Sequence, residues 1–122
     1  GLNPEPFEKF VRARNISITL DIAKGILCGM DPYQFFQRNK NNVKVMHFHG
    51  FSGGSDYHVG FKGYNFDWSG FMSFVKKFDI DVAVTLEIFP MRKWIHFNMP
   101  SQKTFEAAKR FIGDNFEILR RA

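Results

Sequence analysis

The chain contains one cysteine, Cys28, which excludes a fold held together by internal disulfide bonds. Cys28 ends the apolar stretch Ile26–Cys28, and we predict that it is a small buried hydrophobic side chain rather than a nucleophile. The lack of a disulfide framework favours a cytoplasmic location.

Long apolar runs are also absent. No run reaches the roughly 18 residues that a membrane span needs, and the first residues lack the basic-then-apolar pattern of a secretory signal, so we expect no membrane partner. Nor is charge of one sign gathered in a single tract. The net charge of +5 would suit phosphorylated or nucleic-acid ligands, but the basic residues are spread over the predicted helices, which favours an ordinary solvated surface.

Phenylalanine, by contrast, is abundant, at 16 of 122 residues. This number favours a core of large flat side chains, or an apolar surface meant for another chain. Hydrophobic residues make up 44% and charged residues 24%, which is the balance of a soluble globular protein. The length suits one domain over residues 1–122 with a single core.

Three apolar runs rich in β-branched residues predict strands over residues 16–21, 43–49 and 82–89. The last run is apolar on both faces through most of its length, which is typical of a strand covered on both sides. Helical segments alternate with these runs, so we predict an α/β fold with a parallel sheet of about three strands and four helices. Each helix is expected to start at a residue suited to cap it: Asn3, Asp31, Asp67 or Ser101.

The predicted helices carry apolar residues at helical spacing. In the first helix these are Phe7, Phe10 and Val11. The later helices continue the pattern with Phe71, Phe74, Val75 and Phe78, and then with Phe105, Ala108, Ile112, Phe116 and Leu119. Such spacing predicts one apolar stripe for each helix.

Two long connections follow the second and third predicted strands, over residues 50–64 and 90–100. The first is rich in glycine and serine. Both are expected at the carboxyl edge of the sheet, where α/β proteins place their ligand sites.

Each predicted strand delivers one side chain suited to a metal or to proton transfer near its carboxyl end: Asp21, His47 and Glu87. Parallel strands bring these ends together, so the three residues could share one coordination sphere. Two carboxylates and an imidazole suit a divalent cation, which would be Mn, Zn, Mg or Co. Asp56 and His58 add another carboxylate and imidazole from the glycine-rich connection.

Structural roles compete with each of these assignments. Asp21 could cap the helix that follows it, and either His47 or His49, which lie two residues apart and share a strand face, could be a core histidine. Glu87 is harder to explain in this way, because a carboxylate is costly to bury unless it is paired or metal-bound. We treat His96, which has no evident partner, as structural.

Taken in order, the segments around these residues resemble the second half of the xylose-isomerase-like TIM barrel, the superfamily of sugar phosphate isomerases and epimerases and of endonuclease IV. The blocks that carry the resemblance are TLDIAK at 19–24, VMHFHG at 45–50, SDYH at 55–58, FDW at 66–68 and VTLE at 84–87. No single block is specific, but the ordered set covers roughly residues 15–90. The resemblance implies a partial (β/α)₈ barrel, a C-terminal half-barrel whose N-terminal half is absent.

The resemblance also implies roles for individual residues. Asp21, His47 and Glu87 match metal ligands, and Asp56 with His58 matches a pair that binds a second metal in the endonucleases. Glu87 and His47 are expected to be catalytic. Lys24 and His49 are expected to bind a small sugar or sugar-phosphate substrate.

Two departures bear on the kind of activity. Lys24 stands where the family usually has a histidine, and Gly50 replaces an aspartate. Because a protonated lysine cannot ligate a metal but can bind a phosphate or a hydroxyl group, Lys24 favours an isomerase or epimerase over the alternative, an apurinic endonuclease acting on nucleic acid. Both departures also leave open a third reading, an inactive binding or assembly module on the same fold.

A complete barrel takes about 250 residues, so three strands leave open sheet edges and an uncovered interior. We therefore expect a fragment with an incomplete active site, inactive on its own, or a homo-oligomer that buries phenylalanine-rich surface.

Overall fold

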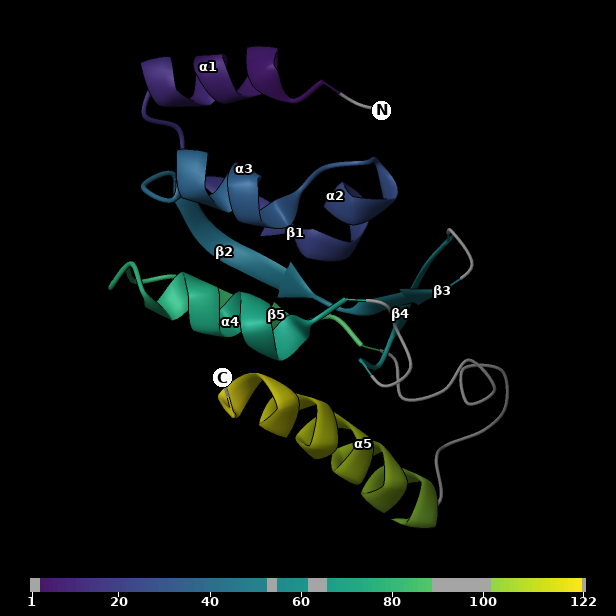
Figure 1. The fold of residues 1–122 in the computed structure, drawn as a ribbon. Helices are drawn as coiled ribbons and strands as arrows, with labels where there is room; N and C mark the ends of the chain where they lie inside the picture. Colours follow the sequence, from purple (N-terminus) through teal and green to yellow (C-terminus); the bar gives the residue numbers. More distant parts are fainter. Residues whose placement is uncertain (1–2, 53–54, 62–65, 89–101, 122) are drawn as a thin grey trace.

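The computed structural model describes residues 3–52, 55–61, 66–88 and 102–121 (Figure 1). The first half contains α1 (Glu5–Ala13), β1 (Ile18–Asp21), α2 (Ile22–Leu27), α3 (Pro32–Asn39) and β2 (Val43–Phe48). The second half contains β3 (Gly50–Ser52), β4 (Ser55–Val59), α4 (Trp68–Lys76), β5 (Ala83–Leu86) and α5 (Gln102–Arg120). The fold is α/β, as predicted. The described part has five helices rather than four, because α2 follows β1 directly.

Strands β1, β2 and β5 form one parallel sheet, in that order. Their order in the sheet is therefore their order along the chain. Asp21 pairs with His47, and His47 pairs with Thr85. The backbone N–H of Glu87 then donates to the carbonyl of Phe48 over 3.0 Å, which carries the pairing past the end of β5. All three carboxyl ends therefore meet at one edge of the sheet.

One face of this sheet is covered by helices, and the other is largely open. Leu20 and Met46, which are neighbours in the register, are buried against α2, α3 and α4. Figure 1 shows these helices in front of the strands. On the opposite face Thr19, Ala83 and Thr85 are exposed. The prediction that the third strand is covered on both sides is therefore wrong: β5 is an edge strand with one face open.

Aromatic side chains fill the covered side, as the phenylalanine content predicted. Phe36, Phe48 and Phe71 have no exposed surface, and the ring of Phe71 contacts those of Phe36 and Phe48 with centroids 6.1 Å apart. Trp68 stacks on Phe61 at 4.8 Å and joins the connection after β4 to this core. Such ring pairs add to the stability that their buried area provides.

The predicted caps Asp31 and Asp67 are confirmed, whereas the cap position of α1 is Pro4 rather than Asn3. Asp31 Oδ1 accepts a hydrogen bond from the backbone N–H of Gln34, and Asp67 Oδ1 accepts one from Gly70. Asn3 Oδ1 accepts from the N–H of Glu5 at the start of α1. These bonds satisfy helix N–H groups that have no partner within the helix. Ser101 lies outside the described residues.

Several local expectations are corrected. The connection over residues 50–64 is in part an antiparallel hairpin, β3 with β4, rather than a loop. Cys28 is exposed at the end of α2 and is not a buried side chain. Ile112 and Phe116 of α5 are 44% and 54% exposed, so the predicted stripe of that helix is only partly buried.

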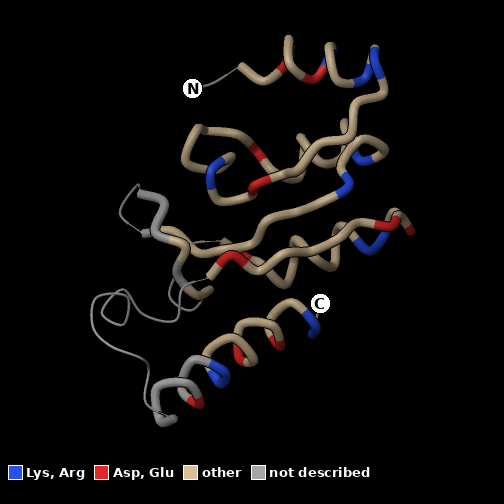
Figure 2. The backbone as a smooth tube through the Cα atoms, turned by 180° about the vertical axis from the view of Figure 1, so that it is seen from behind, with Lys and Arg blue, Asp and Glu red and all other residues tan. Residues whose placement is uncertain are grey.

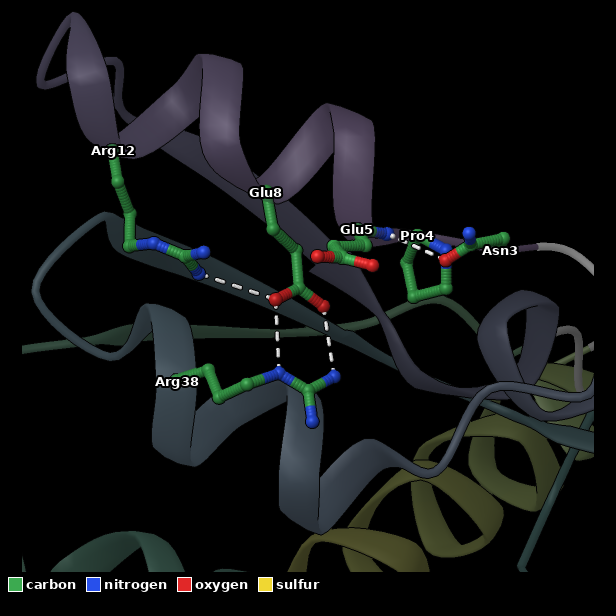
Figure 3. Close-up of a pocket in the computed structure, with 6 residues that line it drawn as sticks. All are labelled: Asn3, Pro4, Glu5, Glu8, Arg12 and Arg38. Carbon is green, nitrogen blue, oxygen red and sulfur yellow. Dashed lines mark hydrogen bonds and ion pairs between the residues drawn. The ribbon is translucent and has the colours of Figure 1, made fainter.

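Helix α1 also differs from its predicted stripe. Phe7 and Phe10 are about half exposed, whereas Val11 and Glu8 are buried. The carboxylate of Glu8 is held by two charged partners, Arg38 at 2.8 Å and Arg12 at 3.1 Å (Figure 3). These side chains line a cleft of about 360 Å³ between α1 and α3. A charge network therefore attaches α1 where apolar packing was expected.

Charged residues are distributed over the described elements rather than gathered in one patch, as Figure 2 illustrates. Within the described residues, no helix is both long enough and apolar enough to cross a membrane.

Candidate metal centre

The three predicted strand-end residues lie together at the carboxyl edge of the sheet. Asp21 is the last residue of β1, His47 is near the end of β2, and Glu87 directly follows β5. One ligand atom from each lies within 4.8 Å of the others. The Nδ1 atom of His47 is 3.0 Å from Oε1 of Glu87. Their side chains are 17–30% exposed, so the group is accessible from the open side of the sheet.

A second group of the same kind shares Glu87. It consists of His49, which follows β2, and His58, which lies on β4, and one ligand atom of each is again within 4.8 Å of one in Glu87. The two imidazole rings stack with centroids 4.1 Å apart. His49 is fully buried, whereas His58 is partly exposed. The hairpin, which Figure 1 shows beyond the arrowhead of β2, brings His58 back to the sheet edge.

His58 is held by its backbone as well as by its ring. Its φ angle of 48° lies in the left-handed region, which residues other than glycine rarely adopt. Its Nδ1 atom lies 2.9 Å from the carbonyl oxygen of Glu87 and 3.7 Å from the carboxylate oxygen Oε2. The ring of His58 is thus directed at Glu87, while its positive φ is shared with Asn15 and Asp79 and does not by itself mark a functional site.

The surroundings of Asp21 act on its pKa in opposite directions. Burial raises its pKa, but the hydrogen bonds from His49 and from the backbone N–H of Lys24, together with the Lys24 ammonium, outweigh burial and hold the pKa of Asp21 well below its usual range. Its Oδ1 atom accepts from Lys24 N at 3.0 Å and lies 3.2 Å from His49 Nε2. Asp21 is therefore a carboxylate at all ordinary pH values. The alternative role as a helix cap is confirmed, and it leaves the ligand role open, because one carboxylate has several lone pairs.

Lys24 lies beside the first group. Its Nζ atom is 3.0 Å from Oδ2 of Asp21, and its side chain is about half exposed. The ammonium is therefore positioned at the rim of the centre. A phosphate or hydroxyl group that reached this rim would meet it.

The remaining predicted site residues have different outcomes. The side chain of Asp56, in β4, lies outside the part that the structure describes, as do His96 and the whole connection 90–100. His49 was predicted to bind substrate, but its ring has no exposed surface and lies among the ligand-type side chains. The pattern His47-x-His49 on one strand contained the clue to this, because residues two apart face the same side.

The donor sets suit divalent cations. Asp21, His47 and Glu87 offer two carboxylates and one imidazole, while His49, His58 and Glu87 offer two imidazoles and one carboxylate. Mixed oxygen and nitrogen sites of this kind bind Mn, Co, Zn or Mg, with more imidazole favouring the later transition metals. By donor chemistry and by spacing, the residues Asp21, His47 and Glu87 could hold a cation.

Comparison with known proteins does not assign this chain to a family. No family model, no curated protein and no solved structure matches it.

Proposed function

We propose that Asp21, His47 and Glu87 bind one divalent cation, and that this cation serves a metal-dependent sugar or sugar-phosphate isomerase or epimerase. The observation that carries the proposal is the meeting of three ligand-type side chains from three separate strands within 4.8 Å. The class of substrate, a sugar or sugar phosphate, is inferred from the resemblance of the segments at the strand ends to xylose-isomerase-like barrels.

The sheet supports the proposed relation to a barrel. Its three strands lie in chain order with the intervening helices on one face, which is the arrangement in the wall of a (β/α)₈ barrel. In a doubly wound sheet the strand order reverses and helices cover both faces. The open face, with Thr19, Ala83 and Thr85, corresponds to the interior of such a barrel. We propose that the chain forms its C-terminal part.

The residues of the centre suit the chemistry. A divalent cation, when bound, supplies Lewis acidity toward two neighbouring oxygens of a hydroxy-ketone. In this proposal Glu87 would accept and return the proton of the intervening C–H bond, and His47 Nδ1, 3.0 Å away, would orient that carboxylate. Lys24 would bind a phosphate or hydroxyl group at the rim. His49, being fully buried, positions Asp21 rather than contacting substrate.

Cobalt absorption spectroscopy tests the proposal without requiring turnover. Titration with Co²⁺ should give a saturating visible absorption band, and a ketose phosphate should shift that band by entering the coordination sphere. Glu87→Gln should weaken Co²⁺ binding at least tenfold, since one ligand charge is lost. A Lys44→Gln variant, at the exposed start of β2 and away from the centre, is the matched control.

The second group that shares Glu87 favours one alternative function, because the endonucleases that the sequence resembles use more than one cation. The test therefore also includes incubation of the chain with a DNA duplex that contains an abasic site. Incision of the duplex, with no response of the cobalt band to any ketose or ketose phosphate, would replace the isomerase by the endonuclease. If the chain binds cobalt but neither substrate class affects it, the inactive module is the better description.

A further inference from the structure

The cleft between α1 and α3 is lined by charged side chains that take no part in the candidate metal centre. It has a volume of about 360 Å³ and is lined by Asn3, Pro4, Glu5, Glu8, Arg12 and Arg38 (Figure 3). We propose that this cleft binds a small carboxylic acid, and that the guanidinium group of Arg12 holds its carboxylate. The proposal depends neither on a metal ion nor on sugar chemistry.

The buried carboxylate of Glu8 holds the two guanidinium groups of the cleft in different ways. Arg38 donates to it from two nitrogens, Nε at 2.9 Å and Nη2 at 2.8 Å. Arg12 donates to it from Nη1 alone, at 3.1 Å, and the same nitrogen donates to Oδ1 of Asn39 at 2.9 Å. Nε and Nη2 of Arg12 therefore have no hydrogen-bond partner among the described residues.

The unused edge of Arg12 is suited to a carboxylate. Nε and Nη2 are the two nitrogens with which Arg38 holds both oxygens of Glu8, so the cleft already contains one carboxylate bound in this way. The N–H groups of this edge are nearly parallel, and their spacing matches the two oxygens of a planar carboxylate. The side chain of Arg12 is 39% exposed, so a solute can reach it.

The charges of the cleft favour an anion with a single charge. Two guanidinium groups, which remain protonated in proteins, face the one carboxylate of Glu8 and leave one positive charge in excess. Glu5 does not supply the missing negative charge, because its carboxylate lies 2.8 Å from the ammonium of Lys9. Glu8 is 2% exposed, so it presents almost no surface to a ligand. A bound monocarboxylate would balance the excess charge.

The volume of the cleft limits the size of the acid. Small-molecule sites in proteins usually occupy about 300–1,000 Å³, and this cleft is near the lower end of that range. We therefore expect an acid of a few carbon atoms, and butyrate is a suitable probe.

NMR titration with sodium butyrate tests the inference. Butyrate should shift the backbone amide signals of α1 and α3 in a saturable way, whereas sodium chloride at the same ionic strength should not. Arg12→Gln should weaken butyrate binding by roughly tenfold or more, since a charge-assisted hydrogen-bonding group is lost. Arg14→Gln is the matched control. It removes the same charge beyond the end of α1, where the guanidinium lies 4.4 Å from the ring centroid of Phe10, and should leave the affinity unchanged.

Three outcomes would overturn the proposal. Unchanged butyrate affinity in Arg12→Gln would remove Arg12 from the site. An equal loss of affinity in Arg14→Gln, or an equal response to chloride, would mean that only general attraction between charges is observed. Tighter binding of inorganic phosphate than of butyrate would overturn the assignment of a carboxylic acid.

The side-chain Nε–H signals of the unaltered chain keep the proposal testable if Arg12→Gln does not fold. Butyrate should shift the Nε–H signal of Arg12, because that group gains a hydrogen bond. The Nε–H signal of Arg38 should change little, because that group already donates to Glu8. A shift at Arg38 without one at Arg12 would contradict the inference.

Discussion

At the scale of single residues, Asp21 combines two positions that sequence analysis treated as alternatives, helix cap and candidate metal ligand, with an ion pair that it did not predict. It caps α2, it forms an ion pair with Lys24, and it lies among the candidate metal ligands. The tasks are compatible because Oδ1 accepts from Lys24 N while Oδ2 faces the Lys24 ammonium. Asp21 is the last residue of β1 and also the residue that caps α2, and this position gives it both the capping role and a place among the candidate ligands.

Asp21→Asn separates capping from metal binding. Asparagine is as good a helix cap as aspartate, so the fold should be retained, but the lost charge should reduce Co²⁺ or Mn²⁺ affinity about 10- to 100-fold. Isothermal titration measures the affinity, and circular dichroism measures the helix content.

Asp31→Asn is the control for that substitution, because Asp31 caps α3 through the same Oδ1 contact and lies outside the candidate ligand groups. It should leave metal affinity unchanged. Equal losses of affinity in both variants would mean that Asp21 acts through the fold rather than as a ligand.

At the scale of elements, α1 is attached through a charge network. Glu8 is 2% exposed and accepts from Arg38 at 2.8 and 2.9 Å and from Arg12 at 3.1 Å. Arg12 also donates to Asn39 on α3. Removing the negative charge leaves two guanidinium groups next to each other without their common partner.

Glu8→Gln should therefore lower the free energy of unfolding by roughly 1–3 kcal/mol at pH 7, as measured by urea denaturation. Glu5→Gln, on the exposed side of the same helix, is the control and should change it little, since exposed ion pairs contribute weakly. A similar loss in both variants would mean that the burial of Glu8 has no energetic consequence.

The same network predicts a pH dependence. The hydrogen bonds from Arg38 lower the pKa of Glu8 from 4.5, against the opposing effect of burial. A carboxyl group with a lowered folded-state pKa stabilises the fold fully above its unfolded-state pKa and loses that contribution as the pH falls through the folded-state value. The stability difference between the unaltered chain and Glu8→Gln should thus be constant above about pH 5.5 and shrink below pH 4.5. Urea denaturation of the unaltered chain and of Glu8→Gln at pH 7 and at pH 3.5 measures this difference in the free energy of unfolding.

Helix α5 is positioned by a close approach to the residue after β4. Asn115 accepts from the N–H of Phe61 at 2.6 Å, and a Cβ on Gly60 would lie 2.8 Å from both Asn115 Oδ1 and the ring of Phe111. A larger residue at position 60 would require the side chains of Asn115 and Phe111 to move. Gly113, in contrast, has open space around its Cα on the exposed side of α5.

Gly60→Ala and Gly113→Ala should therefore change stability in opposite directions. Gly60→Ala should destabilise the chain by about 1–3 kcal/mol through overpacking, and Gly113→Ala should stabilise it by about 0.5–1 kcal/mol through helix propensity. Thermal denaturation of the two variants measures both effects. A stabilised Gly60→Ala variant would contradict the packing of α5 against the hairpin.

At the scale of the whole molecule, several large apolar side chains are exposed among the described residues. Phe7, Phe10, Ile112 and Phe116 are 44–54% exposed, and the open face of the sheet exposes Ala83 and Thr85 beside the candidate metal centre. The edge strands β1 and β5 each have an unpaired side among the described residues. Exposed strand edges and apolar faces promote association.

We therefore expect the chain to associate in solution. Multi-angle light scattering at micromolar concentration should give a mass above the 14.3 kDa of one chain. Phe116→Ser and Phe10→Ser, which remove half-exposed rings from α5 and α1, should each be tested for a shift toward the monomer. A monodisperse monomer of the unaltered chain would contradict the expectation.

The sequence by itself determined the features that depend on neighbouring residues. Alternation of β-branched runs with capped amphipathic segments predicted a parallel α/β fold, and it predicted that Asp21, His47 and Glu87 would meet, because parallel strands end at the same edge. The caps at Asp31 and Asp67 followed from local hydrogen bonding. These features depend only on short-range geometry and on the rule that parallel strands end at the same edge of a sheet.

The tertiary structure alone decided which surfaces are covered. The apolar run around Val84 is the same whether or not a second layer covers the strand, so that run alone did not decide between a strand covered on both sides and the uncovered interior expected for a three-stranded piece. Burial of Glu8 in place of Phe7 depends on Arg38, 30 residues away. The glycine-rich segment became a hairpin that brings His58 to Glu87, because strand pairing and ring stacking across the fold, rather than local propensity, select its conformation.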